Sequence, residues 1–269
     1  MGNIAPGQYI DPSPTEALRF GLFSVANMPD ANGRWNLGVE WEPLAGERAD
    51  LRASECVDDY NTQLELREGE ETLEGVPFVV VGSYGCLSAS RPLEEAEERA
   101  TLHLLAGEER AVERAIVTGE VANEPTLGNG QLLGVPAIAY PLATAVAMLE
   151  SALAEQQGSV GTIHSPRFLA PFFTRDAIVD RRGEHIETLV GTYVAFGAGY
   201  DGPAKESATE YWLYGSGRPT IRRGEVFVQP DETKYLDRSS NWVSVMAQRE
   251  YIVYWDYEPF RVLVDIEES

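Results

Sequence analysis

Residues 90–117 read SRPLEEAEERATLHLLAGEERAVERAIV, and this stretch decides the fold class. Small and aliphatic side chains recur in it at helical spacing: Leu93, Ala96, Ala100, Leu104, Ala111 and Ala115, widened by Leu105, Val112 and Ile116. Pro92 fits the first turn of a helix, Ser90 lies at or just before the N-cap, and the glutamates that follow favour the positive end of the helix dipole. The pattern predicts a helix over 92–117, about 39 Å long at ~1.5 Å per residue. Gly107 either bends this helix or splits it in two.

The elements around this helix predict an α+β protein. Apolar residues at helical spacing predict a second helix over 142–157, which Gly158 ends. Strands are expected at 160–164, 190–196, 211–214, 220–221, 225–228, 242–246, 251–255 and 262–264, and a short helix capped by Ser165-Pro166 is expected to run to about residue 173. Helices lie in the middle and strands dominate both ends, without βαβ alternation, which is the α+β order.

An acidic segment precedes the long helix. Residues 40–74 hold twelve acidic residues and three arginines, Arg48, Arg52 and Arg67. So much charge cannot be buried, while alternation at 39–41 and 63–67 indicates extended chain. We expect a two-stranded loop that projects from the body and is supported by something else, because an isolated hairpin is marginally stable in water. Residues 1–36 are broken by prolines yet apolar, which predicts an arm lying along this subunit or a neighbour.

The charge of the whole chain excludes some functions. Its 269 residues include 43 acidic and 21 basic ones, a formal net charge of −22. Such a surface repels polyphosphate, so we expect no sequence-independent binding of nucleic acid. All basic residues but Lys205 and Lys234 are arginines; arginine suits forked contacts with carboxylates at subunit interfaces, and a GC-rich genome gives the same bias. No apolar run reaches the ~18 residues of a membrane span, no signal peptide is recognised, and Cys56 and Cys86 are read as reduced thiols or, less often, one disulfide.

No pattern predicts a catalytic, cofactor or metal site. His103, His164 and His185 are scattered, and His164 with Ser165 makes no nucleophile–base pair because neighbours on a strand point to opposite faces. We interpret His185 as part of a polar turn. The sequence Gly197-Ala198-Gly199 lacks the third glycine and the helix of a dinucleotide loop, so it is read as a turn.

Arg218, Arg222 and Arg223 form the one basic cluster that the sequence shows. Its partner is either the acidic loop of another copy or an acid of the same subunit, and the sequence leaves both open. Together with the loop arginines Arg48, Arg52 and Arg67, these residues are the candidate assembly contacts.

The C-terminal third carries a recognisable series of motifs: Gly191 and Val194 on one strand, the aromatic strand Tyr211–Gly217, Glu225–Val228 after the arginines, Asn241-Trp242-Val243 leading to Arg249-Glu250-Tyr251, and Glu258-Pro259-Phe260 before the last strand. In this order, after an acidic loop and a long helix, they resemble the Hong Kong 97-type fold of tailed-bacteriophage major capsid proteins. The resemblance implies an N-terminal arm at 1–36, an extended β-hairpin loop at 37–88, a peripheral domain with a spine helix at 89–164, an axial domain at 165–220, and return strands of the peripheral domain at 221–269.

The same resemblance implies a function. The chain would assemble into hexamers and/or pentamers of an icosahedral shell around a phage genome, without enzymatic activity or cofactor and without sequence-specific DNA contacts. Portal, scaffolding or decoration proteins would be further partners, and the protein would be found in the virion after assembly in the host bacterial cytoplasm. The alternatives are an encapsulin-type nanocompartment shell, a minor head or tail protein, and, from another class, an acidic α+β hydrolase.

Overall fold

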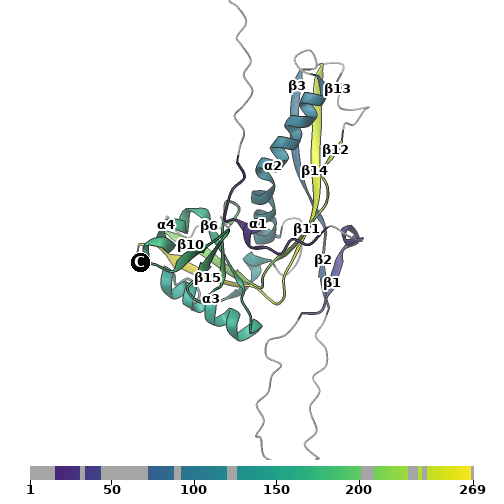
Figure 1. Cartoon of the computed structure of the whole chain (residues 1–269). Helices are drawn as coiled ribbons and strands as arrows, with labels where there is room; N and C mark the ends of the chain where they lie inside the picture. Colours follow the sequence, from purple (N-terminus) through teal and green to yellow (C-terminus); the bar gives the residue numbers. More distant parts are fainter. Residues whose placement is uncertain are drawn as a thin grey trace, which may run out of the picture.

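The computed structural model describes residues 16–30, 34–43, 72–87, 92–119, 126–200, 209–229, 236–237 and 241–267. They form two layered units that share a central region: a five-stranded sheet covered by one long helix, and an eight-stranded sheet with shorter helices (Figure 1). A separate pair of short strands, β1 (Val39–Trp41) and β2 (Leu73–Gly75), follows the short 3-10 turn η1 (Trp35–Leu37). Helix and strand content of this kind is the predicted α+β class, which is confirmed.

The five-stranded sheet is built on one long strand, β14 (Trp242–Tyr254). Along one edge, β3 (Phe78–Leu87) pairs with it in antiparallel register from Trp242↔Leu87 to Tyr251↔Phe78. The other pairing strands are β11 (Thr220–Arg223), β12 (Phe227–Gln229) and β13 (Leu236–Asp237). Residues 78–87, which the resemblance assigned to the extended loop, form an integral strand of this sheet, and Phe78, Val80 and Cys86 at alternate positions are buried in the core beside a helix.

That helix is α2 (Leu93–Thr118), a single helix that continues through Gly107. It ends at Gly119, whose φ of 68° is the left-handed conformation that glycine adopts most easily. Pro92, not Ser90, is the N-cap residue, so the helix begins at Leu93, one residue later than predicted. The helix and β3 approach closely at Gly82, where a Cβ atom would lie 2.4 Å from the backbone nitrogen of Leu104.

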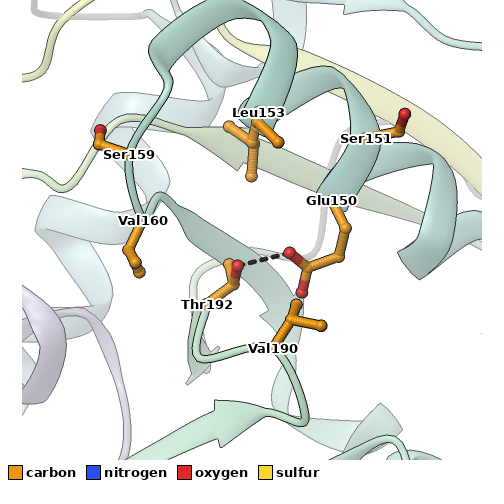
Figure 2. Close-up of a pocket in the computed structure, with 8 residues that line it drawn as sticks. Glu150, Ser151, Leu153, Ser159, Val160, Val190 and Thr192 are labelled. Carbon is orange, nitrogen blue, oxygen red and sulfur yellow. Dashed lines mark hydrogen bonds between the residues drawn. The ribbon is translucent and has the colours of Figure 1, made fainter.

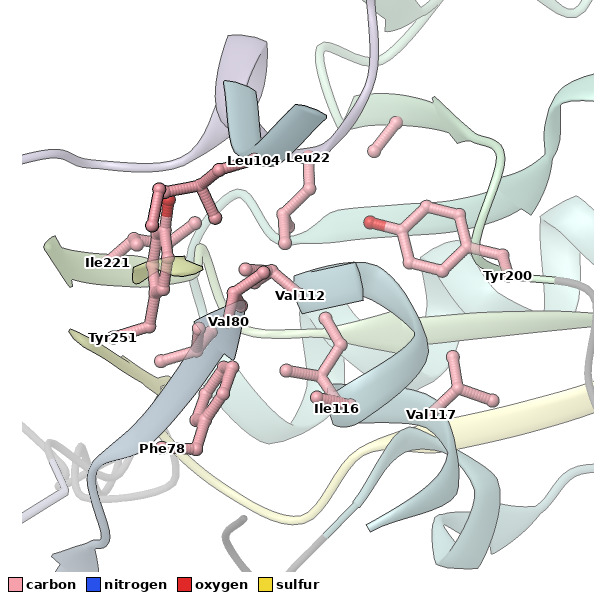
Figure 3. Close-up of a cluster of buried hydrophobic side chains, with 14 of the residues drawn as sticks. Leu22, Phe78, Val80, Leu104, Val112, Ile116, Val117, Tyr200, Ile221 and Tyr251 are labelled. Atoms are coloured by element: carbon pink, nitrogen blue, oxygen red, sulfur yellow. The ribbon is translucent and has the colours of Figure 1, made fainter. Parts of the chain in front are cut away.

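The first core lies between α2 and this sheet and extends to the central region (Figure 3). Leu104, Val112 and Ile116 of the helix pack with Phe78 and Val80 of β3. Two predicted members of the helix stripe, Ala111 and Leu105, are exposed, whereas two glutamates, Glu108 and Glu113, are buried. The stripe was therefore partly wrong, and the reason is the polar partners that these glutamates meet, described below.

The eight-stranded sheet has the order β4-β15-β10-β6-β9-β8-β7, with β5 added beside β15. Its strands are β4 (Gln131–Leu132), β5 (Tyr140–Pro141), β6 (Thr162–Pro166), β7 (Val179–Arg182), β8 (His185–Thr188), β9 (Tyr193–Gly197), β10 (Glu210–Ser216) and β15 (Phe260–Asp265). β6 and β9 are parallel, β10 is antiparallel to both β6 and β15, and β7 and β8 form a hairpin. The helical elements that accompany it are η3 (Leu127–Asn129), α3 (Leu142–Gln157), η4 (Arg167–Leu169) and α4 (Ala170–Arg175).

The second core is formed by α3 and α4 against this sheet. Leu149 and Leu153 of α3 pack with Ile163, Leu213 and Val262 from three strands. The predicted helix over 142–157 is confirmed, and Gly158 ends it with a φ of 58°. All three of the predicted segments 89–164, 165–220 and 221–269 contribute to this one core, through α3, β10 and β15, and the domain division itself stays a prediction.

Three local predictions in this unit were wrong. His185 does not lie in a turn but begins β8, which pairs with β7. The strand expected from residue 190 begins only at Tyr193, because Gly191 has a φ of 96° and turns the chain. Ser165 and Pro166 belong to β6, and the helical turns start at Arg167, so Ser165 is not a helix cap.

Candidate functional site

A segment near the N-terminus is fastened across the region where the two units meet. We call residues 19–27 the strap; it contains α1 (Leu22–Val25). The carbonyl of Phe20 accepts a hydrogen bond from the Phe196 amide at 2.7 Å. Asn27 donates to the Pro219 carbonyl at 2.8 Å and accepts from the Ile221 amide at 2.9 Å. The strap therefore ties β9 of one sheet to β11 of the other, and Figure 1 shows α1 beside α2 at this place.

Two carboxylates of α2 face the strap. Glu113, which is 1% exposed, accepts from the Leu22 amide at 3.1 Å and from the Gly199 amide at 2.9 Å. Glu109 accepts from the Phe23 amide at 2.9 Å. Backbone N–H groups that have no other partner in a short helix or a turn are thereby satisfied by side chains from a distant helix.

Glycines make this approach of backbone to carboxylate possible. A Cβ atom on Gly21 would lie 2.5 Å from Oε1 of Glu109, and one on Gly197 would lie 2.3 Å from Oε1 of Glu113. A Cβ atom on Gly199 would lie 2.4 Å from the Arg110 carbonyl oxygen. The segment Gly197-Ala198-Gly199, predicted from the sequence to be a turn, lies against the carboxylate of Glu113.

Burial shifts the titration of both acids. Desolvation and, to a smaller extent, the neighbouring Glu109 raise the pKa of the Glu113 carboxyl to about 7, against the lowering effect of the backbone amides of Leu22 and Gly199. Desolvation also raises the pKa of Glu109, while the Phe23 amide and Arg167 lower it. The guanidinium of Arg167 donates to the Arg19 carbonyl at 2.9 Å.

The arginine cluster of residues 218, 222 and 223 is spread over separate contacts. Arg218 donates from Nε to the Val25 carbonyl of the strap at 3.0 Å and lies over the ring of Tyr193, 4.8 Å from its centroid. Arg223 lies 3.9 Å from Glu108 of the same subunit, and Nε of Arg222 has no hydrogen-bond partner among the described residues. Arg48, Arg52 and Arg67 lie outside the described residues, so the role of all six arginines in assembly stays a prediction.

Glu108 is the third glutamate of α2 with a specific partner. It accepts from Arg249 and from the Tyr251 hydroxyl, both at 2.7 Å, and so ties the helix to the centre of β14. Burial and the hydrogen bond to Glu108 raise the pKa of Tyr251 well above its usual range. The sequence could not reveal this contact, because the two sides are more than 140 residues apart.

His164 is the centre of a buried polar group. Its Nδ1 lies 2.9 Å from the Tyr200 hydroxyl and its Nε2 lies 2.8 Å from Oγ of Ser216. Because Ser216 donates its own proton to the Gly217 carbonyl, Nε2 is the protonated nitrogen and Tyr200 donates to Nδ1. Burial lowers the pKa of the imidazole to about 3, so the ring is neutral. All three side chains are fully buried, which makes this a structural link between β6, β10 and the turn after β9.

A hollow of about 340 Å³ lies between α3 and the turn before β9. Leu153, Val160 and Val190 give it apolar walls, and Glu150 lies at its side (Figure 2). Both carboxylate oxygens of Glu150 accept from hydroxyls, of Thr188 and of Thr192, each at 2.5 Å. The hollow is therefore lined mainly by apolar side chains, and both oxygens of the carboxylate that lines it, Glu150, already accept hydrogen bonds.

The outer face of the five-stranded sheet carries exposed apolar side chains among polar ones such as Ser83 and Glu250. Side chains there alternate with those beneath α2: Val79 and Val81 on β3, Trp242 and Met246 on β14, and Phe227 on β12, each between 44% and 58% exposed. Among the described residues no element of this chain lies over them. A patch of this kind on one sheet face is typical of a protein–protein interface.

The ends of the acidic segment lie side by side. β1 and β2 pair from Val39↔Gly75 to Trp41↔Leu73, and the ring of Trp41 lies 4.9 Å from that of Tyr254. Residues 44–71, including Cys56, lie outside the described residues, so the projecting loop itself stays a prediction. Within the described ranges there is no group of three or more potential metal ligands and no helix that is long and apolar enough to cross a membrane.

Comparison with known proteins places the fold. No family model and no curated protein matches the sequence. Solved structures do match. The capsid of an empty GTA particle matches with a TM-score of 0.54 and 13% identity, covering 96% of this chain and 95% of that chain. A structure from Gordonia phage Cozz matches with a TM-score of 0.56 and 9% identity, covering 99% of this chain and 91% of that chain, and the capsid of Ralstonia phage GP4 matches with a TM-score of 0.55 and 9% identity, covering 98% of this chain and 96% of that chain. The chain has the fold of phage capsid subunits. The resemblance of fold that the sequence suggested is thereby confirmed over nearly the whole length of both chains.

Proposed function

We propose that this chain is a major capsid protein, many copies of which assemble into an icosahedral shell that encloses a phage genome. The observation that carries the proposal is a fold shared with two capsid structures over 96% or more of this chain and 95% or more of those chains. Since this is the fold of subunits in the compared capsids, we propose a structural role without enzymatic activity or cofactor. The location would be the virion, after assembly in the host cytoplasm.

Surface features support assembly from identical copies. The exposed apolar side chains on the outer face of the five-stranded sheet suit cover by neighbouring subunits. The strong negative charge of the chain is suited to a shell whose inner surface does not bind the enclosed DNA tightly. The boundaries proposed from the resemblance for the arm, the loop and the two domains belong to this proposal, as do further partners such as portal, scaffolding or decoration proteins.

Sedimentation velocity of the purified full-length chain tests the proposal. Over a range of salt concentrations, subunits of 29.6 kDa should convert to rings or to particles that sediment far faster, in a concentration-dependent way. A single monomer boundary at every concentration and salt would count against a shell protein. An acidic hydrolase would behave in that way, and the compared capsid structures do not favour it.

A further inference from the structure

Two glutamates of α2 bind backbone amides of the strap. We propose that Glu109 and Glu113 clamp the strap to the body of the subunit, and that the clamp holds more tightly when one of the two carboxyl groups carries a proton. The strap lies within residues 1–36, the segment proposed as the N-terminal arm, so the inference rests on the proposed function for its meaning. The clamp itself concerns only described residues and is testable without any shell.

The geometry sets two opposing effects at Glu113. The amides of Leu22 and Gly199 favour a carboxylate, because an ionised oxygen accepts N–H bonds more strongly than a neutral one. Burial to 1% exposure and the neighbouring Glu109 disfavour it, because a second negative charge in a site with little water is costly. Gly21, Gly197 and Gly199 crowd the site so closely that there is no space for a bulky cation to compensate.

The charged groups around the pair do not remove this conflict. Arg167, from η4, lowers the pKa of Glu109, but its Nη1 is bonded to the carbonyls of Arg19 and Phe196. From α2 itself, Glu108 adds negative charge near Glu109, and Arg110 and Arg114 are exposed. From the turn after β9, Tyr200 contributes a buried hydroxyl whose own pKa is raised by burial and then by Glu113.

The sign of the pH dependence follows from the raised pKa. In the clamped state Glu113 keeps its proton up to about pH 7, whereas a released carboxyl loses it near its ordinary value of 4.5. Between these values the released state binds fewer protons, so raising the pH favours release. The clamp is tightest at or below pH 4.5, weakens as the pH rises through the interval, and changes little above pH 7. One pKa unit corresponds to about tenfold in the equilibrium.

Hydrogen exchange at the strap measures the clamp directly. The full-length chain in its subunit form is exchanged at pH 5.5 and at pH 8.0, rates are corrected for the intrinsic effect of pH, and the peptide that covers the amides of Leu22 and Phe23 is read by mass spectrometry. We expect protection of this peptide to be about tenfold or more lower at pH 8.0. Peptides from α3 serve as the internal reference. Equal protection of the strap at both pH values would overturn the proposal.

Variants separate the titration from the packing. Glu113→Gln removes the titrating group but replaces one of the two acceptor oxygens, which bind the amides of Leu22 and Gly199, with an NH2 group. Protection of the strap should therefore fall at both pH values, while its pH dependence falls to about twofold or less. Glu94→Gln, at an exposed position of the same helix, should keep the wild-type profile. A Glu113→Gln protein that retains the full pH dependence would contradict the assignment. If this variant does not fold, the pH dependence of strap protection is measured in Glu109→Gln and compared with that of the wild-type protein. Failure of assembly with an intact pH profile would reject the proposed function and leave the clamp standing.

Discussion

Gly82 sets the distance between β3 and α2. A Cβ atom there would lie 2.4 Å from the backbone nitrogen and 2.6 Å from Cα of Leu104, and backbone atoms of a helix cannot give way singly. Gly82→Ala should therefore lower the free energy of unfolding by about 1–3 kcal/mol, the usual range for overpacking. Urea unfolding followed by circular dichroism measures the change.

Gly107 provides the control at an open position, because it lies in α2, the helix that Gly82 approaches, with nothing within 4 Å of its missing Cβ. Gly107→Ala should raise the stability by about 0.5–1 kcal/mol, since alanine restricts the unfolded chain and favours the helix. If both substitutions changed the stability equally, the close approach at Gly82 would be wrongly described.

Residue roles on α2 could be predicted only in part. Ala96, Ala100 and Leu104 were correctly assigned to the buried face from spacing alone. Glu108 and Glu113 were not, because a glutamate is normally solvated and the groups that bury it come from β14 and from the strap. Spacing reveals which side of a helix is covered by apolar surface, but not which polar groups fold over it from elsewhere in the chain.

At the scale of elements, Ala100 tests the assignment of the helix face. It is fully buried against β3, so Ala100→Trp would force a large ring into the contact between helix and sheet. We expect a loss of about 1–3 kcal/mol or more, measured by chemical unfolding, and a failure of assembly under milder conditions than the subunit needs to unfold.

Ala111 is the control for this substitution, since it lies on the same helix but is exposed. Ala111→Trp should change the stability by less than about 0.5 kcal/mol. The sequence analysis predicted Ala111 to be buried. A large loss of stability for Ala111→Trp, with none for Ala100→Trp, would therefore contradict the buried face of α2 that the structure shows.

Strong helices were the elements best predicted from sequence, and strand pairing the least. Both α2 and α3 were found within one residue of their ends, because capping residues and glycine stops are local signals. The β7–β8 hairpin was missed, since Asp180 to Glu187 is too polar to show alternation. The place of β3 in the sheet depends on β14, some 165 residues later, and no local pattern carries that information.

For the whole molecule, the paired strands β1 and β2 allow the acidic segment to be removed cleanly. Deleting residues 44–71 and joining Pro43 to Thr72 through a short Asn-Gly turn keeps the pairing from Val39↔Gly75 to Trp41↔Leu73. The subunit should fold with the parent's circular dichroism spectrum and a similar Tm, yet form no closed particles. An unfolded product would show that the segment belongs to the core; normal particles would show that assembly does not need it.

The central claim is that this chain builds a shell, and cryo-electron microscopy of the purified full-length protein under assembling conditions tests it most directly. The account predicts closed particles with icosahedral symmetry, in which neighbouring subunits cover Val79, Val81 and Met246 on the outer face of the five-stranded sheet. Monomers or small open oligomers under all conditions, or shells in which this face remains bare, would contradict it.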